Sequence, residues 1–183
     1  MKKFIVGLGI VVGLCLSGSA RADDEETRML FGFSPGIGYA RYWQPGFNRG
    51  VEWNMRLSVG MLNRKHMSSL TNSFLLGYTA RHATTEPQII TIIIEPAYWK
   101  FVSLGGRFSQ GFTTFGPLLH IRHLPLVDDD PNLSAGVTLG LGIDWVFRTT
   151  RIRWEVIRVR QLLFDGSFLG TSFGFVWEGE RVS

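Results

Sequence analysis

The chain has 183 residues and a formal net charge of +4, and its only cysteine, Cys15, lies in the first 22 residues. These residues read as a removed leader, so cysteine nucleophiles and cysteine metal sites are excluded from the mature chain. Lys2, Lys3 and Arg21 leave with the leader, which lowers the net charge to +1. So neutral a chain offers no electrostatic support for nucleic-acid binding.

A cleaved signal peptide is predicted at residues 1–22. It has a basic start, an apolar run from Phe4 to Leu16 and the small-x-small pattern Ala20-Arg21-Ala22. The apolar run is too short for a membrane helix, which needs about 20 residues. We therefore expect one mature domain, 23–183, in the oxidising cell envelope.

Period-two alternation dominates the mature chain, in segments separated by turn chemistry, which is the pattern of transmembrane strands. In chain order, strands are expected near residues 29–43, 51–61, 70–81, 88–108, 112–123, 135–147, 151–163 and 169–177. Tight turns are expected at 109–111, 148–150 and 164–166, and exposed loops at 44–50, 82–87 and 124–133. The sequence thus predicts an all-β chain of about eight antiparallel strands.

Two of these strands carry irregularities. Pro96 interrupts the ladder within 88–108, which we interpret as one long bent strand, although strands at 88–95 and 98–108 are an alternative that makes the count odd. Arg158 and Arg160 fall on the apolar face if their strand is regular, which is costly near a bilayer midplane. A bulge near Val156 and Ile157 is therefore predicted to return them inward or to the rim.

Composition decides which face meets lipid, because a water-soluble barrel shows the same period with its faces reversed. The polar faces of the first, sixth and eighth segments are rich in glycine, serine and alanine, which fits the crowded lumen of an eight-stranded barrel. Aromatic residues gather at both ends of the strands, as membrane girdles require. The predicted girdles contain Trp43, Trp53 and Tyr78 at one end, and Trp145, Phe147 and Trp177 at the other. We expect a closed, up-and-down transmembrane β-barrel in the bacterial outer membrane, with both termini periplasmic.

The leader, the eight segments, the girdles and the closing strand from Gly170 to Trp177 resemble the small bacterial outer-membrane barrels. These include outer-membrane protein X, the transmembrane domain of outer-membrane protein A, and the lipid A deacylase and palmitoyltransferase enzymes. The closing strand resembles the C-terminal signal read by the barrel assembly machinery, although six residues follow its aromatic end. We therefore expect the assembly machinery, outer-membrane lipid and lipopolysaccharide as partners of a monomer, with no nucleic acid and no cofactor.

Charged residues on the inward face must be paired, because an isolated ion in a low-dielectric lumen costs several kcal/mol. The predicted lumen network consists of Glu52, Arg56, Arg81, Arg107, Arg122, Asp144, Arg153 and Glu155. We interpret this network as a filled lumen in a barrel with a structural or surface-interaction role. A narrow small-solute pore lined by arginine is an alternative that eight strands disfavour.

A lipid A-modifying acyl hydrolase is the other alternative. The deacylase family places a serine two residues after its catalytic histidine, and His120 to Pro125 resembles that neighbourhood without the serine. His120 and His123 are the candidate catalytic residues of this reading, but a missing nucleophile argues against the activity. The run Asp128 to Asp130 could bind a divalent cation, yet such runs are more often solvated loop tips, so no metal site is predicted.

Overall fold

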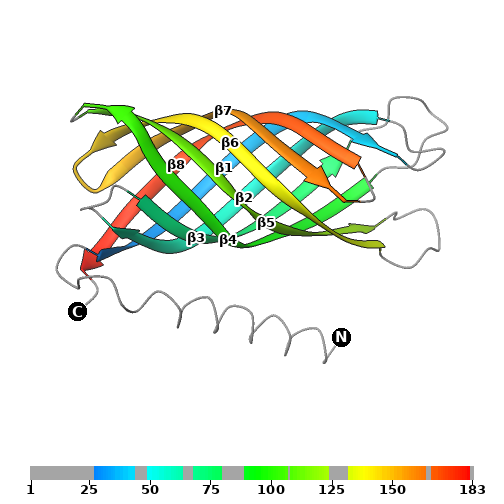
Figure 1. The fold of residues 1–183 in the computed structure, drawn as a ribbon, viewed down its shortest axis with the longest axis horizontal. Coiled ribbons are helices and arrows are strands. Elements are labelled where there is room, and N and C mark those ends of the chain that lie inside the picture. The colour runs from blue at the N-terminus through cyan, green and yellow to red at the C-terminus, as the bar shows by residue number, and fades with distance from the viewer. Residues whose placement is uncertain are drawn as a thin grey trace.

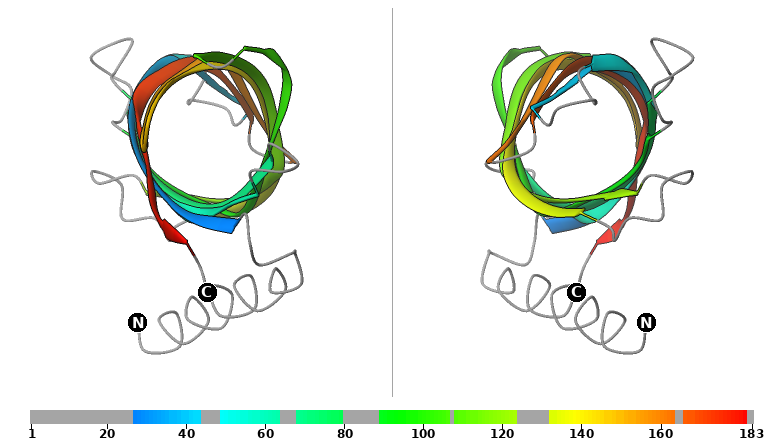
Figure 2. Two further views of the ribbon diagram at one scale, coloured as in Figure 1. Left: turned by 90° about the vertical axis from the view of Figure 1, so that its left-hand side faces the viewer. Right: turned by 90° about the vertical axis from the view of Figure 1, so that its right-hand side faces the viewer.

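Eight antiparallel strands form one closed barrel (Figure 1). The computed structural model describes residues 27–43, 49–63, 68–79, 89–106, 108–123, 132–163 and 166–181. The strands are β1 (Thr27–Tyr42), β2 (Arg49–Asn63), β3 (Ser68–Thr79), β4 (Ile89–Gly105), β5 (Ser109–His123), β6 (Asn132–Phe147), β7 (Thr150–Leu162) and β8 (Gly166–Arg181). Each strand pairs with its sequence neighbours, and β8 returns to pair with β1, which gives the closed ring seen end-on in Figure 2. The predicted all-β, up-and-down barrel is confirmed.

Several predicted features lie in segments that the structure does not describe. The signal peptide 1–22, the loop tips 44–48, 82–87 and 124–131, and the residues Arg81 and Arg107 lie outside the described residues. Within the described ranges, no helix is long and apolar enough to cross a membrane.

The alternation predicted from the sequence places side chains on opposite sides of the barrel wall. The β1–β2 register runs without interruption from Thr27 opposite Asn63 to Arg41 opposite Arg49. Along both strands, the inward residues are mostly small or polar, with Leu30, Tyr42 and Leu62 as buried exceptions near the strand ends, while large apolar residues such as Trp53 and Leu57 are exposed outside. Because the side-chain period of a strand is two residues, an unbroken register keeps each set on its own face.

A β-bulge in β7 confirms the prediction for its two arginines. On the β6 side, Leu141 pairs with Ile157 but Gly142 pairs with Glu155, so β7 carries one extra residue. Val156 and Ile157 both face outward. Before this bulge the odd-numbered residues of β7 face the lumen, and after it the even-numbered residues do. As a result Arg158 and Arg160 are buried in the lumen.

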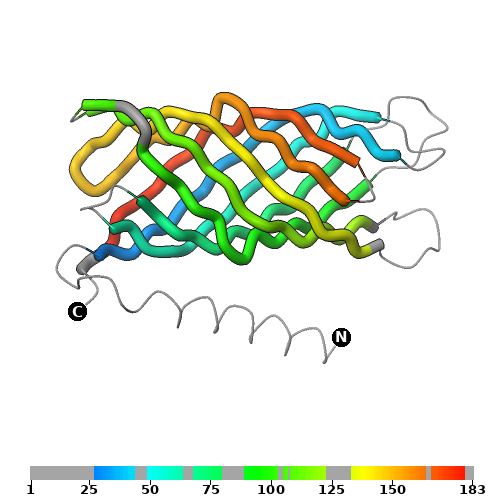
Figure 3. Tube along the Cα trace, viewed as in Figure 1, coloured from blue at the N-terminus to red at the C-terminus, as the bar shows by residue number. Residues whose placement is uncertain are grey.

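A second bulge explains how β4 remains one strand across Pro96, as the preferred sequence interpretation predicted. Proline has no N–H to donate to the ladder, and the pairing with β5 jumps from Ile94 to Trp99. The bulge brings both Glu95 and Tyr98 to the inside, although they are three residues apart. Figure 3 traces β4 as one continuous, bowed strand.

Three turns differ from their predicted positions, one of them because Gly166 of the turn predicted at 164–166 already belongs to β8. The turn predicted at 109–111 is wrong, because Ser109, Gln110 and Gly111 already belong to β5. The hairpin turns earlier, where Gly105 has φ +153° and the Gly106 N–H donates to the Ser109 carbonyl over 2.9 Å. A Cβ on Gly105 would lie 2.5 Å from that carbonyl oxygen, so glycine is required there. The β6–β7 turn is also one residue shorter, because Thr150 already pairs with Phe147 in β7.

The charged lumen as candidate functional site

Many charged side chains lie inside the barrel, together with smaller clusters of apolar ones. Among the residues that the structure describes, seven cations and five anions are buried. They are Arg56, Lys100, Arg122, Arg151, Arg153, Arg158 and Arg160, with Glu52, Glu95, Asp144, Glu155 and Glu178. Burial of an ion is tolerated when it is paired and hydrogen-bonded, so the pairing of these groups defines the site.

A ring of alternating charges crosses the middle of the lumen. Arg56 of β2 lies 3.0 Å from Glu95 of β4 and 3.4 Å from Glu155 of β7, measured between nitrogen and oxygen. Arg158 of β7 forms ion pairs with the same two carboxylates, at 3.2 Å in the case of Glu155. Each arginine therefore contacts both acids and each acid contacts both arginines. We call these four residues the central ring.

Uncharged neighbours hold the central ring in place. Tyr98 donates its hydroxyl to Thr114 Oγ1 over 2.7 Å and also contacts Glu155, and its ring lies 3.9 Å from the Arg56 guanidinium carbon. Thr114 and Ser172 each donate to Glu155, both over 3.2 Å. Residues from β2, β4, β5, β7 and β8 thus meet in one network that ties opposite parts of the wall together.

A second cluster surrounds Asp144, nearer the end of the barrel where β1 begins and β8 ends. Lys100 Nζ lies 2.5 Å from Asp144 Oδ2, and Arg153 donates to both carboxylate oxygens over 2.9 and 3.0 Å. Arg151 donates to Glu178 Oε1 over 2.7 and 2.5 Å and to Gln110 Oε1 over 3.0 Å. The segment after the aromatic end of β8 therefore continues the strand and supplies a lumen carboxylate.

The opposite end of the lumen is richer in aromatic side chains. Arg160 lies 2.5 Å from Glu52 and 3.7 Å from the centre of the Phe168 ring, and Arg122 lies over Tyr42 at 5.6 Å. The imidazole of His120 is 2 % exposed, and its Nδ1 has no hydrogen-bond partner among the described residues. The adjoining cavity has a volume of about 10 Å³, enough for a single water molecule.

The structure places the predicted network residues as follows. Glu52, Arg56, Asp144, Arg153 and Glu155 take part in lumen ion pairs, and Arg122 is buried in the lumen. Sequence reasoning missed Glu95, Tyr98, Lys100, Arg151 and Glu178. Arg151 shares the parity of Arg153 and could have been found, whereas Tyr98 and Lys100 required knowledge of the bulge at Pro96.

The predicted catalytic residues form no catalytic arrangement in the described part of the chain. His120 faces the lumen opposite Ser134, its Cα partner across β5 and β6, but neither His120 Nδ1 nor Ser134 Oγ has a hydrogen-bond partner there. The side chain of His123 and the run Asp128 to Asp130 lie outside the described residues. Among the described residues, no group of His, Cys, Asp and Glu side chains could hold a metal ion.

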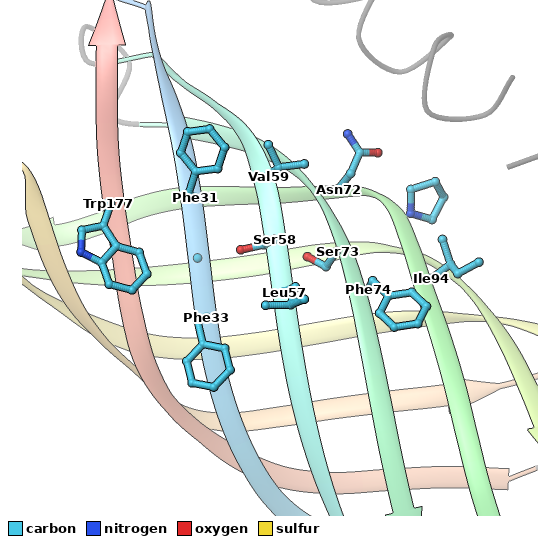
Figure 4. Close-up of a pocket in the computed structure, with 12 residues that line it drawn as sticks. Phe31, Phe33, Leu57, Ser58, Val59, Asn72, Ser73, Phe74, Ile94 and Trp177 are labelled. Atoms are coloured by element: carbon cyan, nitrogen blue, oxygen red, sulfur yellow. The ribbon is translucent and has the colours of Figure 1, made fainter. Parts of the chain in front are cut away.

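The outer surface has the opposite character. All six predicted girdle residues lie on the outward side, with Trp53 57 % exposed. An apolar groove of about 500 Å³ runs over β1 to β4 and β8, between side chains that include Phe31, Phe74 and Trp177 (Figure 4). Large apolar groups exposed on this scale mark a surface that is covered by another apolar phase or partner.

A closed eight-stranded barrel with a charged lumen and an apolar exterior defines a class: the chain has the fold of the small outer-membrane barrels. Neisserial surface protein A is similar at a TM-score of 0.63 and 9 % identity, covering 82 % of this chain and 97 % of that one. Ail, the attachment invasion locus protein of Yersinia pestis, is similar at a TM-score of 0.51 and 8 % identity, with the same coverage. At these identities the likeness shows the fold alone. No protein-family model and no curated protein matches the sequence.

Proposed function

We propose that the chain is an integral barrel of a bacterial outer membrane, with a filled lumen and a structural or surface-interaction role. The observation that carries this proposal is the polarity of the wall. Among the strand side chains that the structure describes, only Arg41 and Arg49 are charged and face outward, whereas twelve charged groups are buried inside. A barrel dissolved in water needs the reverse arrangement.

Lipid explains the outward face. A charged residue on the lipid side of a barrel costs about 2–4 kcal/mol near the midplane and much less near the interface. The two outward arginines lie at the ends of β1 and β2, where this cost is small. The aromatic residues Trp43, Trp53 and Tyr78 at this end, and Trp145, Phe147 and Trp177 at the other, then serve as interfacial girdles.

The central ring supports a lumen that is filled rather than open. Both arginines and both carboxylates of the ring are at most 5 % exposed, and the side chains reach one another across the lumen. We therefore expect no steady unitary currents when the purified protein is placed in a planar bilayer. Steady currents that change on Arg56→Ala would instead support a small-solute pore.

The buried position of His120 disfavours a lipid A hydrolase, because an acyl chain in the membrane reaches the outward face and not the lumen. Mass spectrometry of lipid A from cells with and without the protein should show the same acyl chains. Loss of an acyl chain that is abolished by His120→Ala or His123→Ala would contradict the proposal.

The location itself is tested by fractionation of cells that express the full chain. We expect the protein in the outer-membrane fraction, extractable only with detergent, with a mature N-terminus at Asp23. Recovery of a folded protein in the soluble fraction would overturn the proposal. N-terminal sequencing separately tests the predicted signal peptide 1–22.

A further inference from the structure

Two arginines lie opposite each other on the outside of the barrel, at the end where β1 stops and β2 starts. Arg41 at the end of β1 and Arg49 at the start of β2 are direct Cα partners, and both side chains are exposed. Like charges directly opposite each other destabilise a strand pair. Within the described residues, no carboxylate forms an ion pair with either guanidinium, so nothing there offsets the repulsion.

An apolar surface adjoins this pair along the same two strands. Tyr39 pairs with Val51 one step along the outward face, and Ile37 pairs with Trp53 one step further. Tyr39, Val51 and Trp53 are all exposed. Along β1 and β2, the outward face of the wall therefore changes within a few residues from apolar side chains to two adjacent arginines.

From this juxtaposition we propose that Arg41 and Arg49 bind the phosphate group of an outer-leaflet lipid, whose acyl chains lie against Tyr39, Val51 and Trp53. The inference rests on the membrane location proposed above. The planar guanidinium fork matches phosphate oxygens through paired N–H donors. A phosphate monoester carries about −1.5 to −2 charges near neutral pH, which balances two arginines.

Binding is tested with the purified full-length protein in a zwitterionic detergent, titrated with phosphorylated lipid A. The R41Q/R49Q double variant should bind at least about tenfold more weakly than the wild type, because hydrogen bonds to charged groups are lost. R148Q is the matched control, since Arg148 is an exposed arginine in the β6–β7 turn at the opposite end. Equal binding by the wild type and the double variant would overturn the proposal.

Two further titrations distinguish the source of the phosphate. Lipid A from which the phosphates have been removed should lose the preference for the wild type over the double variant. Inorganic phosphate at the same concentrations should neither bind measurably nor displace lipid A. Tight binding of inorganic phosphate alone would contradict a lipid site, because the apolar contacts with Tyr39, Val51 and Trp53 would then contribute nothing.

Thermal unfolding separates a ligand site from a purely structural role. Without lipid A, R49Q should raise the Tm because it removes the repulsion between the two guanidinium groups. With lipid A present, the wild type should gain more in Tm than R49Q, because only the wild type has both phosphate ligands. An equal gain in Tm on addition of lipid A by the wild type and R49Q would overturn the inference.

The experiments can refute the proposed membrane location and the arginine site separately. If the wild type and R41Q/R49Q both insert into vesicles but bind lipid A equally well, only the arginine site is wrong. If neither protein inserts, the membrane location is wrong and the arginine site falls with it.

Discussion

Arg56 and Leu57 are neighbours in β2, yet they lie in opposite surroundings. Arg56 is 4 % exposed and paired within the central ring, whereas Leu57 is 55 % exposed on the outer wall. The same contrast recurs at the other buried charged residues of the wall, such as Arg153 beside the exposed Trp154. In a water-soluble protein these preferences are reversed, so the comparison identifies the solvent of each face.

Breaking the inner face should have the largest effect. Glu155→Gln leaves Arg56 and Arg158 with one ionised carboxylate, Glu95, between them. Removing one partner of a buried ion pair costs about 3–5 kcal/mol, so the free energy of unfolding should fall by about that amount. Urea unfolding of the protein in lipid vesicles measures it.

The control for that prediction restores the charge balance. The double variant Glu155→Gln with Arg158→Gln removes one cation together with one anion and should recover part of the lost stability. A single variant as stable as the wild type would mean that the central ring does not hold the barrel together.

Breaking the outer face should have the next largest effect. Leu57→Arg puts a charge on the outward side in the middle of β2, where the expected cost is about 2–4 kcal/mol in a bilayer. Met61→Arg puts the same charge on the same face nearer the end of the strand, where the cost falls to about 0–1 kcal/mol. Equal costs at the two positions, measured by unfolding from vesicles, would contradict a lipid-facing wall.

Crowding the lumen should have a smaller effect. A Cβ at Gly140 would lie 2.5 Å from both Glu155 Oε1 and Thr114 Oγ1, so Gly140→Ala must displace side chains that hold the central ring. Overpacking of this kind costs about 1–3 kcal/mol. Gly106→Ala is the matched control, because a Cβ there meets nothing within 4 Å. A Gly140→Ala variant no less stable than Gly106→Ala would show that the lumen around Gly140 is not tightly packed.

Much of this architecture follows from the sequence, because period-two alternation requires no tertiary information. The bulge in β7 was also predictable, since two arginines on a lipid face have a cost that one extra residue removes. The inward placement of Tyr98 and Lys100 was not predictable, because it results from the bulge in β4, whose register depends on the pairing with β3 and β5. The pairing of the central ring was not predictable either, because its four residues come from β2, β4 and β7, and only closure of the barrel brings those strands together.

The shifted hairpin turn between β4 and β5 has a local cause. Gly105 adopts a backbone that other residues rarely adopt, and it precedes the Ser109-Gln110-Gly111 stretch, which also has turn composition. Gln110 lies inside the barrel, where it accepts a hydrogen bond from Arg151 over 3.0 Å. Tertiary contacts therefore decided between two candidate turns.

Tryptophan fluorescence offers the most direct test of which solvent bathes the outer wall. All six tryptophans of the chain lie on the outward face, so they report on one side of the wall. In vesicles whose lipids carry bromine on their acyl chains, the emission should be strongly quenched relative to vesicles of unbrominated lipid. Unchanged emission in the brominated vesicles, from a protein that stays folded without lipid or detergent, would contradict the account.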